Sequence, residues 1–275
     1  MTDRYALVGN PVAQSKSPAL HAAFARQLGH DLTYEAILAT KENFHETVRR
    51  FIREGGKGMN ITAPFKLDVL DLVDTMSERA QAAQAVNTLK FDEHGVYADN
   101  TDGAGLVNDI QDYMGVSLKG RRLLVVGAGG AARGIFLPLL QAAPSYFLVV
   151  NRTEHKAHEI VGEHAAPGKV EAGAISQAAG GQFDVVINAT SASLTGDHLP
   201  LPKGAYAQGA LAYELAYNKG HTPFMDDARQ GGAARIADGL GMLIGQAAEG
   251  FLLWRGVRPD VTEVMEMLRG SIKAI

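Results

Sequence analysis

Three polar side chains stand close together in the segment GMNITAPFK, residues 58–66. Its apolar pattern predicts a strand followed by a helix that starts at Pro64, so Asn60, Thr62 and Lys66 lie around the end of the strand. Open α/β sheets bind ligands at the carboxyl ends of their strands. The helix dipole does not favour a lysine at a helix N-terminus, which points to a ligand role for Lys66. Taken alone, an ordinary solvated surface lysine fits Lys66 at least as well.

Two serines and one aspartate stand at the starts of other predicted helices. Ser15 and Ser17 precede Pro18, and a serine followed by proline predicts Ser17 as the N-cap and Pro18 as the first helical residue. Two hydroxyls at a helix N-terminus suit a small carboxylate ligand. Asp102 precedes a helix predicted to run to about Met114. Ser17 and Asp102 are each either a helix cap or part of a binding site.

A glycine-rich turn follows the apolar run LLVV at residues 123–126. Gly127, Gly129 and Ala132 form a GxGxxA pattern between this predicted strand and a helix. Such a pattern allows a tight turn, a close backbone approach to a pyrophosphate and close packing of helix on strand. The segment predicts a dinucleotide site, and the alternative is a plain turn between a strand and a helix.

The end of the next predicted strand, residues 146–150, indicates which dinucleotide binds. An NAD site places an acidic residue there, ~20 residues past the glycines, to bind the ribose. This chain has Asn151, Arg152 and Thr153 instead, with Lys156 nearby. Arginine can stack on adenine and pair with a 2′-phosphate, so the sequence favours NADP over NAD. The alternative is that Arg152 and Lys156 are ordinary surface charges.

The order of the predicted elements is that of an α/β protein. Strands and helices alternate through the first hundred residues, which predicts an open, mostly parallel sheet with helices on its faces. The glycine turn begins a second, Rossmann-like region, whose first helix should be kinked or shortened by Pro138. Two helices follow that region, from Met242 to Trp254 and over residues 261–272.

Composition narrows the classes of partner. The chain has 275 residues, a net charge of −4 and no cysteine. It has no long basic block, no apolar run of membrane-spanning length and no secretory pattern at its start. We therefore expect a cytoplasmic protein without metal-binding thiolates, whose partners are small molecules rather than nucleic acid or membrane.

Several segments, in this order and spacing, resemble shikimate dehydrogenase. They are SKSP (15–18), GMNITAPFK (58–66), AVNT (85–88), NTDG (100–103), GAGGAARG (127–134), NRT (151–153), NATS (188–191) and GLGMLIGQ (239–246). This family reduces 3-dehydroshikimate to shikimate with NADPH. The resemblance covers the whole chain, and it implies the same reaction here.

The resemblance also implies roles for individual residues. Lys66 and Asp102 match the catalytic pair. The implied substrate contacts are Ser15, Ser17, Asn60, Thr62, Asn87, Tyr217 and Gln246. A lysine ammonium can hydrogen-bond the carbonyl oxygen as charge develops on it, and a neighbouring carboxylate favours the charged lysine. We therefore expect a positioned donor and acceptor pair rather than a neutral lysine base.

The implied NADP contacts lie in the second region. They are Gly127, Ala128, Gly129, Gly130, Ala131, Asn151, Arg152, Thr153, Lys156, Thr190, Ser191, Leu215, Gly239 and Met242. The chain departs from the family pattern at Glu214, where most members have aspartate, and at Lys219, where most have proline.

The expected organisation is two domains around a cleft. Residues 1–102 with 242–275 are expected to bind substrate, and residues 103–241 to form an inserted Rossmann domain that binds NADP. A broader quinate/shikimate dehydrogenase and an NADP-sensing protein without turnover stay open as alternatives. The expected assembly is a monomer or a homodimer.

Overall fold

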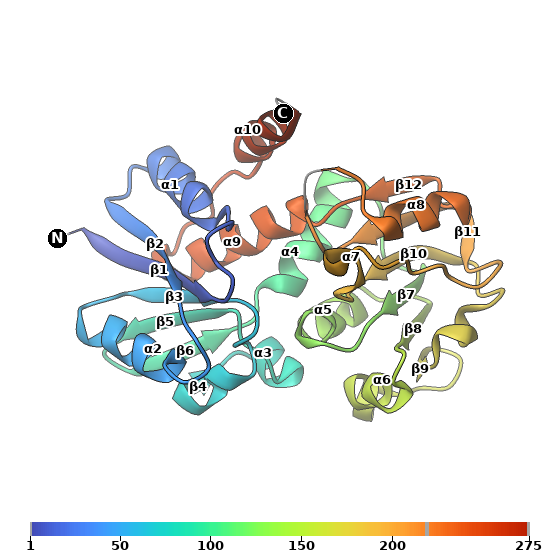
Figure 1. Ribbon diagram of the computed structural model, residues 1–275, viewed down its shortest axis with the longest axis horizontal. Coiled ribbons are helices and arrows are strands. Elements are labelled where there is room, and N and C mark those ends of the chain that lie inside the picture. The colour runs from blue at the N-terminus through green and yellow to red at the C-terminus, as the bar shows by residue number, and fades with distance from the viewer. Residues whose placement is uncertain (1, 218–219, 274–275) are drawn as a thin grey trace. The chain divides into compact units, whose positions relative to one another are not determined.

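The computed structural model describes residues 2–217 and 220–273. It divides into two compact units (Figure 1): unit 1 comprises Met1–Gly105 and Leu243–Ile275, and unit 2 comprises Leu106–Met242. The chain passes from unit 1 to unit 2 within helix α4 (Asp102–Asn108) and returns within helix α9 (Leu240–Arg255). Both units contain a sheet with helices packed on it, which confirms the predicted α/β class.

Unit 1 contains a mixed sheet, in which the described strands have the order β2-β1-β3-β5-β6-β4. Strand β1 pairs in parallel with β2 and β3, β5 is antiparallel to both β3 and β6, and β4 pairs in parallel with β6. The strands are β1 (Asp3–Gly9), β2 (Leu32–Leu38), β3 (Gly58–Ile61), β4 (Thr75–Met76), β5 (Thr88–Asp92) and β6 (Gly95–Asp99). The other elements are α1 (Ser17–Leu28), α2 (Phe44–Arg53), η1 (Asp68–Leu72), α3 (Glu78–Ala83) and α10 (Thr262–Lys273).

The two faces of the unit 1 sheet are covered differently. Helix α2 packs on one face, where Phe44 stacks on Phe65 with ring centroids 4.3 Å apart. On the other side, α1 and α9 form an aromatic cluster in which His21 stacks on Tyr34 at 4.3 Å. Burial lowers the pKa of His21 to about 3, so this ring is neutral and acts as an apolar surface.

Unit 2 has a wholly parallel sheet among its described strands, in the order β12-β11-β10-β7-β8-β9. Counted from β7 as the first strand and read from β9, this order is 3-2-1-4-5-6, that of the Rossmann fold. The strands are β7 (Arg122–Val126), β8 (Tyr146–Val150), β9 (Val170–Gly173), β10 (Phe183–Asn188), β11 (Tyr206–Glu214) and β12 (Arg235–Ala237). The helices are η2 (Asp109–Tyr113), α5 (Gly130–Gln141), α6 (Glu154–Val161), η3 (Gly162–His164), η4 (Ile175–Ala178), α7 (Ala192–Thr195) and α8 (Pro223–Gln230).

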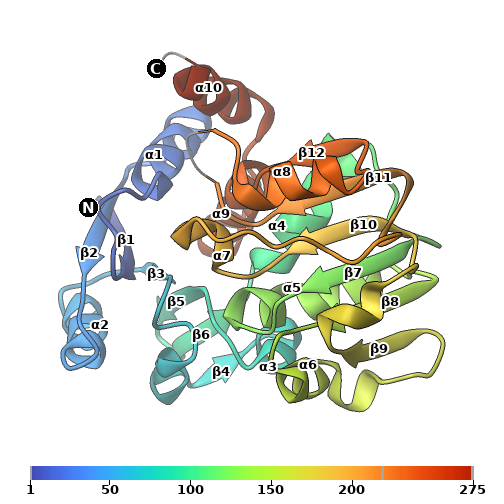
Figure 2. The ribbon, with the colours of Figure 1, turned by 45° about the vertical axis from the view of Figure 1, so that its right-hand side comes forward.

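Helices cover both faces of the unit 2 sheet (Figure 2). Helices α5 and α6 bury one face, and α8 with η4 buries the other. The direction in which successive strands are added to the sheet reverses between β7 and β10, because β8 and β9 lie on one side of β7 and β10 lies on its other side. Ligands of doubly wound sheets bind at this switch point. Among the described residues, we find no helix that is both long and apolar enough to cross a membrane.

Three local expectations are wrong. Helix α1 begins at Ser17 itself, so Ser17 is not the N-cap, and that position belongs to Lys16. The segment after Pro64 forms turns and the short 3₁₀ helix η1 instead of a longer helix from Pro64. Helix α5 is not shortened by Pro138 and continues to Gln141; the Gly134 carbonyl, four residues earlier, is the group that loses its helical donor.

Candidate active site

Lys66 and Asp102 form an ion pair in unit 1. Lys66 lies in the turn after β3, and Asp102 is the first residue of α4. The Lys66 side chain is 20% exposed and that of Asp102 is 7% exposed, so little water reaches the carboxylate while the lysine side chain stays partly accessible. The structure thus brings together two residues that lie 36 positions apart in the sequence.

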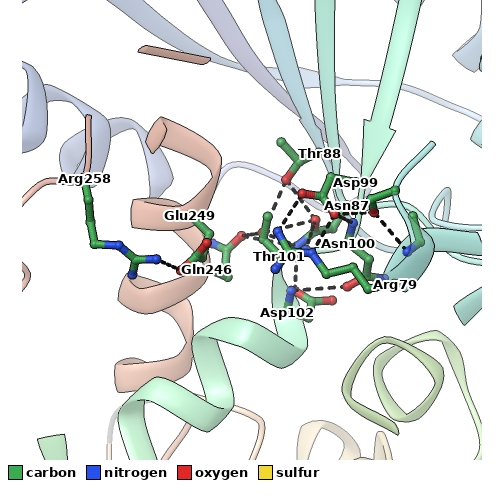
Figure 3. A network of polar contacts seen from close by, with 12 residues as sticks. Arg79, Asn87, Thr88, Asp99, Asn100, Thr101, Asp102, Gln246, Glu249 and Arg258 are labelled. Carbon is green, nitrogen blue, oxygen red and sulfur yellow. Dashed lines mark hydrogen bonds and ion pairs between the residues drawn. The ribbon is translucent and has the colours of Figure 1, made fainter. Parts of the chain in front are cut away.

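Neutral donors hold the carboxylate of Asp102 from the other side (Figure 3). Asn87 Nδ2 donates to Asp102 Oδ1 at 2.8 Å, and the backbone amide of Asp102 donates to Asn100 Oδ1 at 3.2 Å. Asn100 in turn donates its side-chain amide to the Ala85 carbonyl at 2.9 Å. The backbone of the loop between β6 and α4 is therefore fixed, and Asp102 Oδ2 faces Lys66.

Asn87 connects Asp102 to helix α9 (Figure 3). Its Nδ2 also donates to Thr101 Oγ1 at 3.0 Å, and its Oδ1 accepts the Thr101 amide at 2.9 Å. Gln246 Oε1 lies 3.4 Å from both Asn87 Nδ2 and Thr101 Oγ1. The predicted contacts Asn87, Asp102 and Gln246 are therefore neighbours, and Thr101 is an added member that the motif analysis missed.

A buried ion pair behind this network also escaped the sequence analysis. Arg79 donates to both carboxylate oxygens of Asp99, at 2.7 and 2.6 Å, and Ser77 Oγ donates to Oδ1 at 2.6 Å. Burial raises the pKa of Asp99, but the hydrogen bonds from Arg79 and Ser77 outweigh it and hold the pKa below its usual value. Asp99 also accepts the amide of Asn100, so it supports the loop that carries Asp102.

The predicted serines lie side by side at the start of α1. Ser15 Oγ and Ser17 Oγ are 3.2 Å apart, and the Ser17 amide donates to Ser15 Oγ at 3.2 Å. Thr62 follows β3 directly, and its amide donates to the Val8 carbonyl at 3.0 Å. These hydroxyls are donors for a small anionic or polyhydroxyl ligand.

Asn60 can contribute less than its type suggests. Both hydrogens of its Nδ2 go to protein acceptors, the Asn87 carbonyl at 3.1 Å and Thr88 Oγ1 at 3.0 Å. Its Oδ1 accepts the Tyr34 hydroxyl at 2.7 Å. A ligand that meets Asn60 therefore finds an acceptor there and no free amide hydrogen. Tyr34, on β2, carried no sequence signal for this role.

The glycine turn of unit 2 lies at the switch point of the sheet. Gly127 follows β7 with φ +120°, and a Cβ there would come within 2.9 Å of the Ala189 carbonyl group. Gly129 is the N-cap of α5, and no atom lies within 4 Å of a Cβ built on it. Ala128 completes the turn, and Gly130 and Ala131 open the helix. Open space beside unpaired helix amides fits a pyrophosphate.

The segment after β8 fits a phosphate on the ribose. Arg152 and Lys156 are exposed, and the carboxamide of Asn151 donates to the Thr153 carbonyl at 3.0 Å. Thr153 precedes α6, and its carbonyl also accepts the Lys156 amide at 3.1 Å. An amide and two cations at this strand end suit a 2′-phosphate better than a bare 2′-hydroxyl.

The other predicted cofactor residues lie in the loops that follow β10, β11 and β12, except Met242, which lies in the first turn of α9. Asn188 Oδ1 accepts the amide and the hydroxyl of Thr190, which fixes the turn that contains Ser191. The Gly239 amide donates to the Ala216 carbonyl at 3.1 Å, beside Leu215. The Met242 amide donates to the Tyr213 hydroxyl at 3.1 Å.

Tyr217 is the predicted substrate contact that belongs to unit 2, in the segment after β11. Burial raises the pKa of its hydroxyl, so Tyr217 is a neutral donor near pH 7. Lys219, the noted departure from the family pattern, lies outside the described residues. The assignment of all these residues to substrate or cofactor stays a prediction.

Family models match three parts of the chain. A model described as the shikimate dehydrogenase substrate binding domain matches residues 7–89. A second, described as shikimate / quinate 5-dehydrogenase, matches residues 109–196, and a third, described as the shikimate 5′-dehydrogenase C-terminal domain, matches residues 239–269. The matches follow the chain in the order of the motifs.

Known proteins are similar over nearly the full length. A shikimate dehydrogenase (NADP(+)) from Nitrosospira multiformis is 54% identical over 272 residues, which cover 99% of each chain. An Ael1 enzyme from Pseudomonas putida is 50% identical, with a TM-score of 0.90 over 97% of this chain and 98% of that one. A shikimate 5-dehydrogenase from Thermus thermophilus, solved with NADP(H) and shikimate, is 32% identical, with a TM-score of 0.86 over 98% and 100% of the two chains.

The two glycines of the turn should respond differently to the same substitution. Gly127→Ala combines a positive φ with the contact to Ala189, and should lower the free energy of unfolding by about 1–3 kcal/mol. Gly129→Ala should change it by less than about 0.5 kcal/mol, because its backbone is extended and its surroundings are open.

The added methyl of Gly129→Ala would occupy the space next to the helix amides, so this variant should bind NADPH at least about tenfold more weakly. Thermal unfolding without cofactor and a fluorescence titration with NADPH measure the two effects. A Gly129→Ala variant that binds NADPH as tightly as the unmodified protein would contradict the placement of the pyrophosphate.

Proposed function

Because the chain belongs to the shikimate dehydrogenase family, we propose that it reduces 3-dehydroshikimate to shikimate with NADPH and catalyses the reverse reaction with NADP⁺. The observation that carries the chemistry is the Lys66–Asp102 ion pair, with the carboxylate held by Asn87 and the lysine side chain still partly accessible. A protein that only binds NADP has no need for such a pair.

The substrate is held by polar side chains of known direction. Ser15 and Ser17 donate to its carboxylate, and Asn60 accepts from a ring hydroxyl through Oδ1. The remaining contacts to the hydroxyl groups come from Thr62, Asn87, Tyr217 and Gln246. The shared network of Asn87, Thr101 and Gln246 fixes these groups before the substrate arrives, which lowers the entropy lost on binding.

Lys66 and Asp102 handle the proton at the reacting oxygen. When bound, NADPH supplies the hydride that adds to the carbonyl carbon. Lys66 Nζ hydrogen-bonds the carbonyl oxygen, stabilises its developing negative charge and donates the proton that completes the hydroxyl. Asp102 orients Lys66 through the ion pair, and water then returns a proton to Lys66. In the reverse direction the same steps run backwards: Lys66 first gives a proton to water, and it then accepts the proton of the substrate hydroxyl as the hydride leaves.

The cofactor is held by unit 2. The amides of the turn from Gly127 to Ala131 bind the pyrophosphate, and Asn151, Arg152, Thr153 and Lys156 bind the adenosine with its 2′-phosphate. Thr190, Ser191, Leu215, Gly239 and Met242 border the nicotinamide. The support is that these residues all follow the carboxyl ends of the parallel strands.

The domain roles, the assembly and the compartment belong to the same proposal. Residues 1–102 with 242–275 bind substrate, and residues 103–241 bind NADP. The protein acts in the cytoplasm as a monomer or a homodimer, and the absence of cysteine is consistent with a reducing compartment.

Shikimate oxidation tests the function directly. We expect the purified protein to form NADPH from NADP⁺ and shikimate, as followed by the near-ultraviolet absorbance of NADPH. Quinate is the second substrate to assay, because one matching family model is described as shikimate / quinate 5-dehydrogenase. Turnover of quinate at a similar kcat/KM favours the broader enzyme. NADP binding without turnover of either compound favours the sensor.

Replacing the catalytic lysine should separate chemistry from binding. Lys66→Ala removes the ammonium that stabilises the oxygen, so kcat should fall at least about a hundredfold while the KM for shikimate changes by less than about fivefold. Lys90→Ala is the control, because Lys90 lies on β5 and pairs with Asp92 instead of Asp102. A Lys66→Ala variant with near-normal kcat would rule out the catalytic assignment.

Arg152 should determine the choice between NADPH and NADH. Arg152→Ala removes a charged partner of the 2′-phosphate, so the KM for NADPH should rise about tenfold while the KM for NADH stays within about twofold. The matched control is Lys169→Ala, an exposed cation of the same unit that precedes β9. A preference of the unmodified protein for NADH would refute the NADP assignment.

A further inference from the structure

We propose that Glu214 is a positioning residue for the cofactor, because its one carboxylate fixes two separate loops that border the nicotinamide. This inference rests on the NADP site of the proposed function. Glu214 is the last residue of β11 and is fully buried.

Both oxygens of the carboxylate accept hydrogen bonds from neutral groups. Oε2 accepts from Asn188 Nδ2 at 2.9 Å, from Ser193 Oγ at 2.5 Å and from Thr222 Oγ1 at 3.1 Å. Oε1 accepts from the Ala216 amide at 3.1 Å. Among the described residues, the donors to this buried carboxylate are all neutral, and the loss of any one of them is unfavourable because an unpaired buried acceptor is costly.

The first loop follows β10. Glu214 accepts a hydrogen bond from the carboxamide NH₂ of Asn188. This bond directs Asn188 Oδ1 toward the amide and hydroxyl of Thr190, which donate to it at 3.0 and 2.7 Å. Ser193 donates to the same carboxylate from helix α7, at the end of this loop. The turn that contains Thr190 and Ser191 is thus held at both ends by Glu214.

The second loop follows β11. Ala216, whose amide donates to Glu214, lies between Leu215 and Tyr217. Its carbonyl accepts a hydrogen bond from the Gly239 amide at 3.1 Å. Glu214 therefore fixes the backbone at Leu215 and, through Ala216, the segment of Gly239. Thr222, which also donates to Glu214, is the N-cap of α8 and anchors the start of that helix.

Glutamate suits this place because its carboxylate has acceptors only. In Glu214→Gln, the remaining oxygen can still accept the three hydrogen bonds that Oε2 accepts. The new NH₂ group then faces the Ala216 amide, and two donors cannot form a hydrogen bond with each other. Glu214→Asp retains both acceptor oxygens, but its side chain is one methylene shorter. If the backbone keeps its position, the carboxylate then lies farther from its donors. Both changes act on the four donors to Glu214, which all belong to unit 2.

The test measures NADPH binding apart from catalysis. For Glu214→Gln we expect the Kd for NADPH, from a fluorescence titration, and the KM for NADPH each to rise about tenfold. The KM for shikimate should rise less than the KM for NADPH, because Tyr217 is the one proposed substrate contact that follows the Ala216 amide and the others lie in unit 1. Glu214→Asp should show a smaller rise in the same two constants. Thermal unfolding identifies the temperature range in which each variant is folded.

Two further variants make the result decisive. Glu171→Gln is the matched control, since Glu171 lies on β9 and accepts from Tyr146 and Gly168, away from these loops. It should leave the Kd for NADPH unchanged. Ser193→Ala removes a single donor and should raise that Kd about threefold, so it decides the matter if Glu214→Gln does not fold.

The outcomes separate the two proposals. If the unmodified protein binds NADPH and turns over shikimate, but folded Glu214→Gln, or Ser193→Ala in its place, retains the full affinity for NADPH, the positioning role is wrong and the proposed function stands. An equal loss of affinity in Glu171→Gln also overturns it. If the unmodified protein does not bind NADPH, the proposed function fails, and the inference fails with it.

Discussion

The carboxylate of Asp102 lies where little water reaches it, so the protein itself has to supply its hydrogen-bond donors. Asn87, the residue before β5, supplies a neutral donor, and Lys66 supplies a charged donor. Asn100 accepts the Asp102 amide and so holds the backbone in place. This requirement links a turn, a strand pair and helix α9 into one network (Figure 3). Because Lys66 is the most exposed of these partners, it is also the partner that a ligand can meet.

Unit 2 also contains a buried carboxylate, that of Glu214, but the protein supplies its hydrogen-bond donors in a different way. The donors to Glu214 are neutral and internal, whereas Asp102 has a cationic partner at its open side. A carboxylate with neutral, buried donors holds backbone in place, and a carboxylate beside a partly accessible lysine can take part in proton transfer. The chemical difference between these two acids therefore comes from their partners, since both side chains end in the same group.

Local patterns predicted the parts of the site that are local. The turn from Gly127 to Gly129 and the segment after β8 could be found because strand, turn and helix follow one another directly in the sequence. The pairing of Lys66 with Asp102 could be assigned only from the family resemblance, since no spacing rule joins residues so far apart. Asp99 with Arg79, Thr101 and Tyr34 were missed for the same reason. Their roles depend on strand pairing, and β3 pairs with β1 and β5 across long loops.

Unit 1 is discontinuous, because residues 243–275 complete a unit that residues 1–105 begin. Protein synthesis proceeds from the N-terminus, so the segment that carries Gln246 and packs on one face of the unit 1 sheet is made after unit 2. Unit 2 is a single continuous stretch and is complete before that segment appears. The sheet of unit 1 is thus begun before unit 2 and completed after it, and the apolar surface that α9 covers stays open while unit 2 is being synthesised.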